Sequence, residues 1–386
     1  MTSNQKTKVF IGILSVIILL TLIITFIGRA PSENIRLGAV LFLSGEFKSY
    51  GEQFRDGARI AVDEINRNAE SDDDRVELII YDSQANIQVA RERLQTLRER
   101  DKIDYIVEIM GSGIAINTID YITDNNMLVL SGVNTSPDFT YEGGENFFRI
   151  IPSDGVASQQ LAEWSSEMGW NRTAIVYSTD VWGTGLKNVL ETTLKELGSD
   201  ILLVKDTEMG QSIFQPVVSD LRRVDPDVVF ILLYPREAGL FMREARRQNF
   251  KTNFMGTDNL TGDEFRNVGG DAVEGVKFVI PAAERSDSPK YQHFLKMFRE
   301  KYGDDRDPAL FSITGYDCIH LMVETYKSAN GDVDKGREYL KNVRFEGASS
   351  IIEFDQYHDV IVADYARNIF DRDPERNRIV IKEYEN

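Results

Sequence analysis

Cysteine and histidine are scarce in this chain of 386 residues. Cys318 is its only cysteine, so the sequence excludes a disulfide bond within the chain. The histidines, His293, His320 and His358, lie far apart in the sequence and show no spacing typical of metal ligands. We therefore expect no metal site and no cofactor.

The chain also lacks net positive charge. It has 44 lysines and arginines against 62 aspartates and glutamates, which gives a formal net charge of −18 at pH 7. Phosphate backbones and anionic lipid headgroups bind basic surfaces. The composition therefore argues against nucleic acid or an anionic membrane surface as the partner.

Motifs of common enzyme classes are missing. Gly111-Ser112-Gly113 follows an apolar stretch, but Ile116 stands where a dinucleotide-binding loop has its third glycine. The sequence has no G-x-S-x-G nucleophile motif and no Cys/His pair suited to catalysis. We expect a binding protein rather than an enzyme.

A long uncharged segment lies near the N-terminus. Residues 9–27 carry no charge and follow Lys6 and Lys8. At ~1.5 Å per residue this segment is long enough to span a bilayer, whereas a cleaved signal peptide has a shorter apolar core. We expect a single-pass membrane anchor with residues 1–8 as a cytoplasmic tip and the bulk of the chain outside the cytoplasm. A removed signal peptide is the alternative.

Two series of alternating strands and helices follow this segment. The first begins with a strand at 35–42, and the second begins with a helix at 153–168. Such alternation is typical of parallel sheets flanked by helices. Without the first 34 residues, 386 − 34 = 352 remain, more than a typical single domain contains. The predicted fold class is α/β, with two Rossmann-like lobes.

The last part of the chain is mostly helical, with helices expected at 289–302, 309–329 and 333–343, and two short strands at 351–354 and 360–365. Helices that return to the first lobe, and strands that join the second, require three crossovers between lobes. We expect these near Ile150–Pro152, Ile280–Ala282 and Phe345–Gly347. The lobes would then comprise residues 35–151 plus 281–346, and 152–280 plus 347–386. Three parallel connections permit hinge bending.

Small polar residues end two neighbouring strands of the first series. Gly111, Ser112 and Gly113 end one apolar run, and Ser131 to Thr135 end the next. In an open parallel sheet the carboxyl ends of the strands border the ligand crevice. Hydroxyls and free backbone N–H groups in this place can hold a small anion such as a carboxylate.

Six motifs occur along the chain in a characteristic order: IRLGAVLFLSGEFKSYGEQFRDGARIAVDEIN, IVEIMGSG, LVLSGVNTSPDF, AIVYSTDVWGTGL, FMGTDN and AVEGV. In this order and spacing the chain, from Ile35 to about Tyr365, resembles type I periplasmic binding proteins of the branched-chain amino acid (Leu/Ile/Val) group. Those proteins are the substrate-binding proteins of ABC importers. The resemblance implies a Venus-flytrap fold in which a ligand is captured between two lobes.

The resemblance also implies a set of ligand-binding residues. Ser112 would hold the ligand carboxylate, together with the hydroxyl of Thr135 and the backbone of Val133, and Asp258 would accept from the ligand ammonium. The aromatic residues around the ligand would be Tyr50, Trp182 and Tyr234. The chain departs from the family at two of these positions. The family often has Glu where this chain has Asp258, and commonly has Tyr where this chain has Trp182. A small disulfide of the family is absent, because Gly111 occupies one of its positions.

Each of these residues also has a simpler interpretation. Ser112 could cap a helix, Thr135 could belong to a turn, and Asp258 could form an Asx turn. Tyr50 and Tyr234 could pack at a rim, and Trp182 could cover the crevice without contacting ligand.

The function implied by the resemblance is capture of an amino acid, branched-chain or otherwise apolar, by hinge closure. Delivery would be to the permease subunits of an ABC importer. The alternatives are a membrane-tethered ligand sensor that signals through another protein, and transport of an amide, urea or an aromatic acid.

Overall fold

The computed structural model of the chain describes residues 34–45, 47–281, 288–304, 306, 308–361, 365–375 and 377–384. The predicted anchor at 9–27 lies outside these residues. No helix within the described ranges is long and apolar enough to span a bilayer.

A five-stranded parallel sheet forms the centre of the first lobe, in the order β2-β1-β3-β4-β5. Its strands are β1 Ile35–Leu41, β2 Val76–Asp82, β3 Tyr105–Ile109, β4 Leu128–Ser131 and β5 Phe147–Arg149. Strands β3 and β4 are buried at every residue, as expected of parallel strands with both faces covered. Strand β5 was not predicted, because its three residues are too few to show a periodic pattern.

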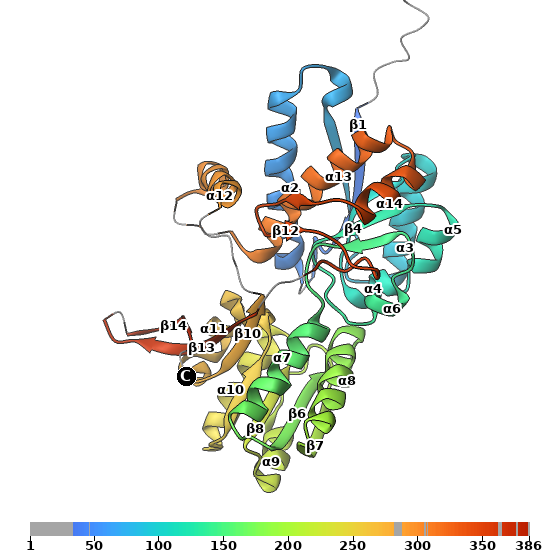
Figure 1. Cartoon of the computed structure of the whole chain (residues 1–386). Coiled ribbons are helices and arrows are strands. Elements are labelled where there is room, and N and C mark those ends of the chain that lie inside the picture. Colours follow the sequence, from blue (N-terminus) through green and yellow to red (C-terminus); the bar gives the residue numbers. More distant parts are fainter. Residues whose placement is uncertain are drawn as a thin grey trace, which may run out of the picture.

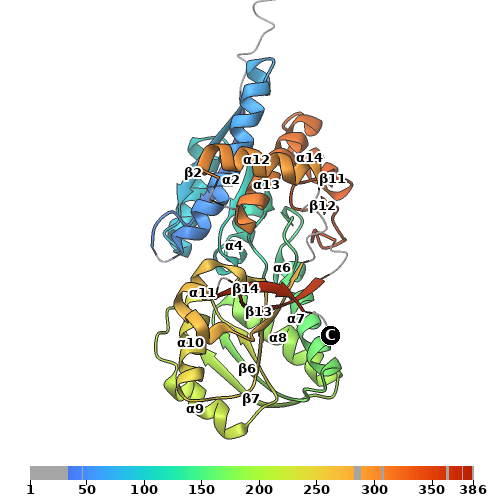
Figure 2. The same ribbon diagram turned by 90° about the vertical axis from the view of Figure 1, so that its left-hand side faces the viewer.

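The helices of the first lobe come from two distant parts of the chain. The early ones are α2 Lys48–Asn68, α3 Ile87–Gln95, α4 Ser112–Ile116, α5 Ile119–Asp124 and α6 Phe139–Glu142, and the late ones are α12 Pro289–Tyr302, α13 Leu310–Ala329 and α14 Val333–Lys341. Figures 1 and 2 show α13 beside α2 and α14 near α13. Buried residues of α12, α13 and α14 belong to the core of the first lobe.

Helices α2 and α13 approach each other closely through two glycines. A Cβ atom on Gly57 would lie 1.7 Å from the backbone oxygen of Ser312, and one on Gly315 would lie 2.4 Å from that of Phe54. The backbones can pack at this distance only because neither glycine has a side chain.

The second lobe is built on a larger sheet, in the order β14-β13-β10-β9-β8-β6-β7. Its parallel strands are β6 Arg172–Ser178, β7 Asp200–Thr207, β8 Val228–Leu232, β9 Asn253–Gly256 and β10 Lys277–Pro281. Two late strands, β13 Tyr365–Asp373 and β14 Arg378–Glu383, extend it in antiparallel fashion. Helices α7 Asp154–Glu167 and α8 Val181–Glu196 share one core cluster of this lobe, and α9 Gln215–Val224, α10 Pro235–Arg247 and α11 Asp263–Gly269 share the other.

Both parallel sheets have the same topology. The order β2-β1-β3-β4-β5 in the first lobe corresponds to β7-β6-β8-β9-β10 in the second. The strand order reverses between β1 and β3 and again between β6 and β8. In open α/β sheets these reversal points are where ligands bind, beyond the carboxyl ends of the strands.

The third crossover differs from the prediction. We expected it near Phe345–Gly347, but β11 Phe345–Glu346 pairs with β12 Ile351–Ile352, and Phe354 and Val360 lie in the core of the first lobe. The chain enters the second sheet only with β13. The apolar residues after 350 stay with the first lobe because they are buried against its core. In addition, Asp359 forms an ion pair with the buried Arg149, with Oδ1 2.5 Å from Nε.

Candidate functional site

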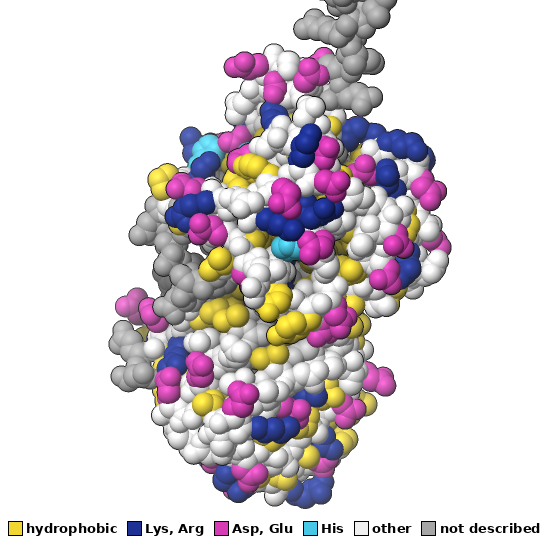
Figure 3. Space-filling model, turned by 45° about the vertical axis from the view of Figure 1, so that its right-hand side comes forward, with side chains coloured by type: hydrophobic (Ala, Val, Ile, Leu, Met, Phe, Trp, Pro, Cys, Tyr) yellow, Lys and Arg dark blue, Asp and Glu magenta, His cyan; other side chains and the backbone are white. Residues whose placement is uncertain are grey.

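The predicted ligand-binding residues lie where the two lobes meet. In the first lobe Ser112 follows β3, Val133 and Thr135 follow β4, and Tyr50 lies in the first turn of α2, after β1. In the second lobe Trp182 follows β6, Tyr234 follows β8 and Asp258 follows β9. Asp154 joins Thr135 of the first lobe to Trp182 and Asp258 of the second, and Phe47 joins Tyr50 of the first lobe to Tyr234 of the second. Figure 3 shows hydrophobic side chains gathered along the boundary between the lobes.

The first lobe presents two neighbouring polar loops. Ser112 is buried, and its hydroxyl oxygen accepts a weak hydrogen bond from the backbone N–H of Ser136, at 3.4 Å. Gly111 precedes it with φ of 99°, and a Cβ there would lie 2.5 Å from the ring of Phe42. Glycine is therefore required at 111, and its conformation sets the entry into α4. Ser112 opens that helix without a side-chain cap at its N-terminus, so the capping interpretation has no support.

Asp154, which the sequence analysis did not select, connects the loop after β4 to the second lobe. Its backbone N–H donates to the carbonyl oxygen of Thr135 at 2.9 Å, and its carboxylate accepts from the Thr135 hydroxyl. The same carboxylate accepts from Nε1 of Trp182, at 2.6 Å. Asp154 is the first residue of α7, where Ser153 caps the helix by accepting from the Gly155 N–H. A carboxylate is favoured at this helix N-terminus.

Asp154 and Asp258 interact with each other. Burial raises the pKa of Asp154 to about 6. Burial, and next the negative charge of Asp154, raise the pKa of Asp258 to about 8. Arg149 is a nearby cation, but it is paired with Asp359 and donates to the carbonyl oxygen of Ser136 at 2.6 Å. Two carboxyls therefore share the site, one buried at Asp154 and one half-buried at Asp258.

Aromatic rings line the other side of the boundary. The rings of Trp182 and Tyr234 lie 4.7 Å apart between centroids, and the Tyr234 hydroxyl donates to Asp180 at 2.7 Å. Phe47, which was not predicted, bridges the lobes: its ring lies 5.3 Å from that of Tyr234 and stacks on that of Tyr50 at 6.3 Å. Burial raises the pKa of Tyr50 and Tyr234, so both phenols are neutral and can donate hydrogen bonds.

The lobes also touch beside α8. The hydroxyl of Ser136 in the first lobe donates to the carbonyl oxygen of Val181 in the second, at 3.5 Å. A Cβ on Gly185 would lie 2.9 Å from that hydroxyl and 3.0 Å from Pro137. The two lobes are thus in contact along this edge, with Gly185 allowing the close approach.

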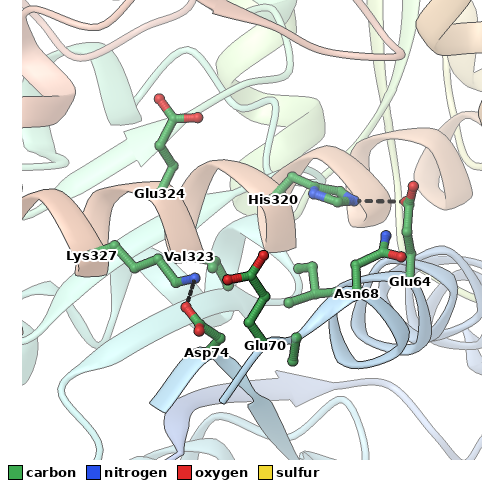
Figure 4. A pocket seen from close by; sticks show the side chains of 10 residues that line it. Glu64, Asn68, Glu70, Asp74, His320, Val323, Glu324 and Lys327 are labelled. Atoms are coloured by element: carbon green, nitrogen blue, oxygen red, sulfur yellow. Dashed lines mark hydrogen bonds and ion pairs between the residues drawn. The ribbon is translucent and has the colours of Figure 1, made fainter. Parts of the chain in front are cut away.

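Two grooves lie elsewhere. One, of about 480 Å³, runs between α2 and α13 on the outside of the first lobe and contains Glu64, Asp74, His320 and Lys327 (Figure 4). The other, of about 550 Å³, lies on the second lobe beside α9 and α10. Neither contains a predicted ligand-binding residue, and we do not assign the site to either.

Two of the histidines that are distant in sequence meet at Glu64. His293 Nε2 lies 2.7 Å from one carboxylate oxygen of Glu64, and His320 Nε2 lies 3.2 Å from the other. In the part of the chain that the structure describes, no group of three or more His, Cys, Asp or Glu residues could hold a metal ion.

Comparison with known proteins identifies the family. The model of the periplasmic binding protein family matches residues 34–366. This chain belongs to the periplasmic binding protein family. A curated relative is the leucine-, isoleucine-, valine-, threonine- and alanine-binding protein of Pseudomonas aeruginosa, 23% identical over 90% of this chain and 93% of the relative.

Solved structures of periplasmic binding proteins share the fold. The leucine-binding protein LivK of Thermotoga maritima has a TM-score of 0.78 and 23% identity, over 90% of this chain and 97% of its own. A solute-binding protein from R. palustris, solved with 4-hydroxybenzoate, has a TM-score of 0.81 and 17% identity, over 92% of this chain and 96% of its own. The predicted type I fold with two lobes is confirmed. As a member of this extracytoplasmic family, the chain is a solute-binding protein and not an enzyme.

Proposed function

We propose that this chain is the substrate-binding protein of an ABC importer and captures an amino acid, branched-chain or otherwise apolar, between its lobes. The observation that carries the proposal is that three kinds of group lie together between the lobes: hydrogen-bond donors, carboxyls and aromatic rings. Hydroxyl and backbone donors of the first lobe lie next to two carboxyls, the buried Asp154 and the half-buried Asp258, and next to a set of aromatic rings. A zwitterion with an apolar side chain is complementary to all three.

The ligand carboxylate would bind to the first lobe. Ser112 supplies a hydroxyl, and the loops after β3 and β4 supply backbone N–H groups. The Thr135 hydroxyl would turn from Asp154 to the ligand carboxylate. Arg149 is already paired with Asp359, which leaves neutral donors to receive the anion. Hydrogen bonds to a charged group contribute roughly 1.5–3 kcal/mol each, so a few of them support micromolar binding.

The ligand ammonium would bind to the carboxyls. Asp258 is the acceptor implied by the family resemblance, Asp154 adds a second, and the carbonyl oxygen of Val133 can add a third. An ammonium beside both aspartates offsets the repulsion and burial that raise their pKa values. The rings of Tyr50, Trp182 and Tyr234 would then contact the apolar side chain.

Capture would be coupled to the position of the lobes. Ligand that contacts Thr135 in one lobe and Asp258 in the other favours the closed arrangement over the open one. The crossovers between the lobes would act as the hinge. Permease subunits of the importer would recognise and bind the closed form. A helix at 9–27 would hold the protein at the membrane.

An aromatic acid is the second candidate ligand. It is favoured by the aromatic rings of the site and by the 4-hydroxybenzoate complex of the R. palustris neighbour. An aromatic acid has no ammonium, however, and would leave Asp154 and Asp258 without a cation. For this reason we place amino acids first, ahead of aromatic acids, amides and urea.

A thermal-shift screen of the full-length chain in detergent tests the proposal. The panel comprises the twenty amino acids, urea, acetamide and 4-hydroxybenzoate. A ligand at a hundred times its Kd stabilises the folded protein by about 2.7 kcal/mol. We expect L-leucine, L-isoleucine or L-valine to raise the unfolding temperature. A response to 4-hydroxybenzoate or urea alone would contradict the amino acid assignment and leave the fold untouched.

Delivery to a transporter needs a separate test, because a membrane-tethered sensor would bind the same ligand. We expect the full-length chain to co-purify with ABC permease subunits from its native membranes. Co-purification with a signalling protein instead would favour the sensor.

A further inference from the structure

A carboxyl group lies at the centre of the first sheet, behind the loop proposed to bind ligand. Glu108 is on β3 and has 0% of its surface exposed. Its side chain forms no ion pair within the described residues. An acid in such a place is costly to bury unless its oxygens accept hydrogen bonds.

Three hydrogen-bond partners of the Glu108 side chain come from the last residue of β4 and the loop that follows it. The Ser131 hydroxyl lies 3.0 Å from both carboxyl oxygens, the Gly132 backbone N–H donates to one of them at 2.9 Å, and Nδ2 of Asn134 donates to the other at 2.8 Å. Burial raises the pKa of Glu108 to about 8, against the opposing effect of the Gly132 and Ser131 hydrogen bonds. The group is thus mainly neutral at neutral pH, and its proton can be shared with the Ser131 hydroxyl.

The same loop is held from its other side. The Thr314 hydroxyl donates to the carbonyl oxygen of Gly132 at 2.8 Å, and Nδ2 of Asn134 also donates to the carbonyl oxygen of Ile109 at 2.7 Å. A Cβ on Gly132 would lie 2.9 Å from Thr314 and 3.1 Å from Cys318. The loop therefore has little room to move toward the helix α13, and Glu108 holds it to the sheet.

We propose that Glu108 is a positioning residue for ligand binding, which fixes the segment Ser131–Asn134 so that Val133 and Thr135 are held in place for the ligand. This inference rests on the proposed function, since Val133 and Thr135 matter only if they bind ligand. Ser131 extends the effect, because its hydroxyl oxygen accepts from the backbone N–H groups of Val133 at 3.3 Å and Asn134 at 3.1 Å.

Two variants of Glu108 test the inference. Glu108→Leu removes every hydrogen bond to the loop at similar size. Glu108→Gln keeps the shape but puts an NH₂ group, which cannot accept, opposite either the Gly132 N–H or the Asn134 Nδ2. We expect Leu to be the more severe change and Gln to be intermediate. Asp317→Asn is the matched control, because Asp317 is also buried in the first lobe and holds a different turn through the N–H groups of Ala348 and Ser349, each at 2.7 Å.

The first measurement is hydrogen–deuterium exchange of the full-length chain without ligand. We expect the amides of 131–136 to exchange roughly tenfold faster or more in Glu108→Leu, less so in Glu108→Gln, and at the wild-type rate in Asp317→Asn. This readout does not depend on which ligand the protein binds. Wild-type exchange of 131–136 in both Glu108 variants would overturn the inference, and if Glu108→Leu does not fold, Glu108→Gln alone decides.

The second measurement is the Kd for L-leucine by calorimetry. We expect it to rise roughly tenfold or more in Glu108→Leu, with partial recovery in Glu108→Gln and no change in Asp317→Asn even where that control lowers the unfolding temperature. Equal loss of affinity in Asp317→Asn would show a general effect of stability and overturn the inference. If the wild-type protein binds no branched-chain or other apolar amino acid, the amino acid assignment fails, while the exchange rates still decide whether Glu108 holds the loop.

Discussion

At the scale of single residues, Asp154 and Asp258 dominate the chemistry of the interlobe site. Asp154 is buried and Asp258 is half-buried, and the negative charge of Asp154 makes ionisation of Asp258 less favourable. Neutral hydrogen-bond donors, by contrast, occupy the first-lobe side. This asymmetry distinguishes a site for a zwitterion from a site for a simple anion, and it leads to two predictions.

The first concerns Asp258 as the ammonium acceptor. Replacing it with Asn keeps the shape and removes the charge, so the Kd for L-leucine should rise more than about tenfold. Isothermal titration calorimetry of the full-length chain measures this. Asp263→Asn is the control and should leave the Kd unchanged. Asp263 lies in the next helix, and its side chain is 84% exposed. An unchanged Kd in Asp258→Asn would rule out the zwitterion model.

The second concerns pH. The folded-state pKa values of Asp154 and Asp258 are raised, so they add stability to the ligand-free protein at low pH and lose it as the pH rises through about 6 and about 8. Glu108 contributes in the same direction. Ligand binding has the opposite dependence, because the ammonium needs ionised carboxylates. From about pH 5 to about pH 9 the unfolding temperature without ligand should therefore fall, while the increase caused by L-leucine should grow.

Asp258→Asn provides the control for the pH dependence. Without the titrating group at 258, the increase caused by L-leucine should vary less with pH. A ligand-induced shift that is equal at all pH values in the wild-type protein would show that these aspartates do not accept the ammonium.

At the scale of helices and strands, the packing of α2 against α13 joins the N-terminal part of the first lobe to its late helices. The contact depends on Gly57 and Gly315, whose backbones meet the neighbouring helix directly. Thr314 of α13 also donates to the carbonyl oxygen of Gly132, in the loop after β4 that we propose binds ligand. The late helices are therefore part of the scaffold of the site.

Gly57→Ala tests this packing. The added methyl group would overlap the backbone oxygen of Ser312, so one helix must move, and we expect a loss of about 2 kcal/mol or more in the free energy of unfolding. Urea denaturation measures it. Gly262→Ala is the control, because a Cβ there meets nothing within 4 Å, and it should change stability little. Equal stability of the two variants would show that the helices can separate without cost.

At the scale of the whole molecule, the two lobes contact each other through Phe47 and Tyr234 and along the edge of α8 at Gly185. These contacts join elements that belong to different sheets. They are made only when the lobes are close together, so they contribute to the closed arrangement and not to the folding of either lobe. Substitutions here should change ligand binding more than stability.

Gly185→Leu separates these two effects. A side chain at 185 would meet Ser136 and Pro137 of the other lobe, so the lobes cannot close fully. We expect a weaker affinity for L-leucine, and small-angle X-ray scattering should show a larger radius of gyration with L-leucine present than for the wild-type protein. Asn188→Leu places the same side chain at an exposed position of α8 and should have neither effect. A wild-type affinity in Gly185→Leu would show that this edge does not need to close.

The local periodicity of apolar residues was enough to predict most helices and strands. It did not reveal a very short strand, and it did not show to which lobe a late segment belongs. Pro289–Tyr302 has the predicted bounds, since the helical period of its apolar residues is visible within a few turns. Strand β5 is too short for such a pattern, and the segment 351–360 was predicted for the wrong lobe. Its apolar residues indicate burial, but they carry no information about which surface they cover.

The sequence by itself determined the α/β alternation, the two lobes, the family and the loops that follow the strands, because each of these depends on periodicity or on motifs in a local stretch. The fold alone places Asp154 beside Asp258, Phe47 against Tyr234, and Glu108 within hydrogen-bonding distance of the loop after β4. Those contacts join residues far apart in the chain. Burial and like-charge repulsion arise only when folding brings such segments together, so local sequence does not specify them.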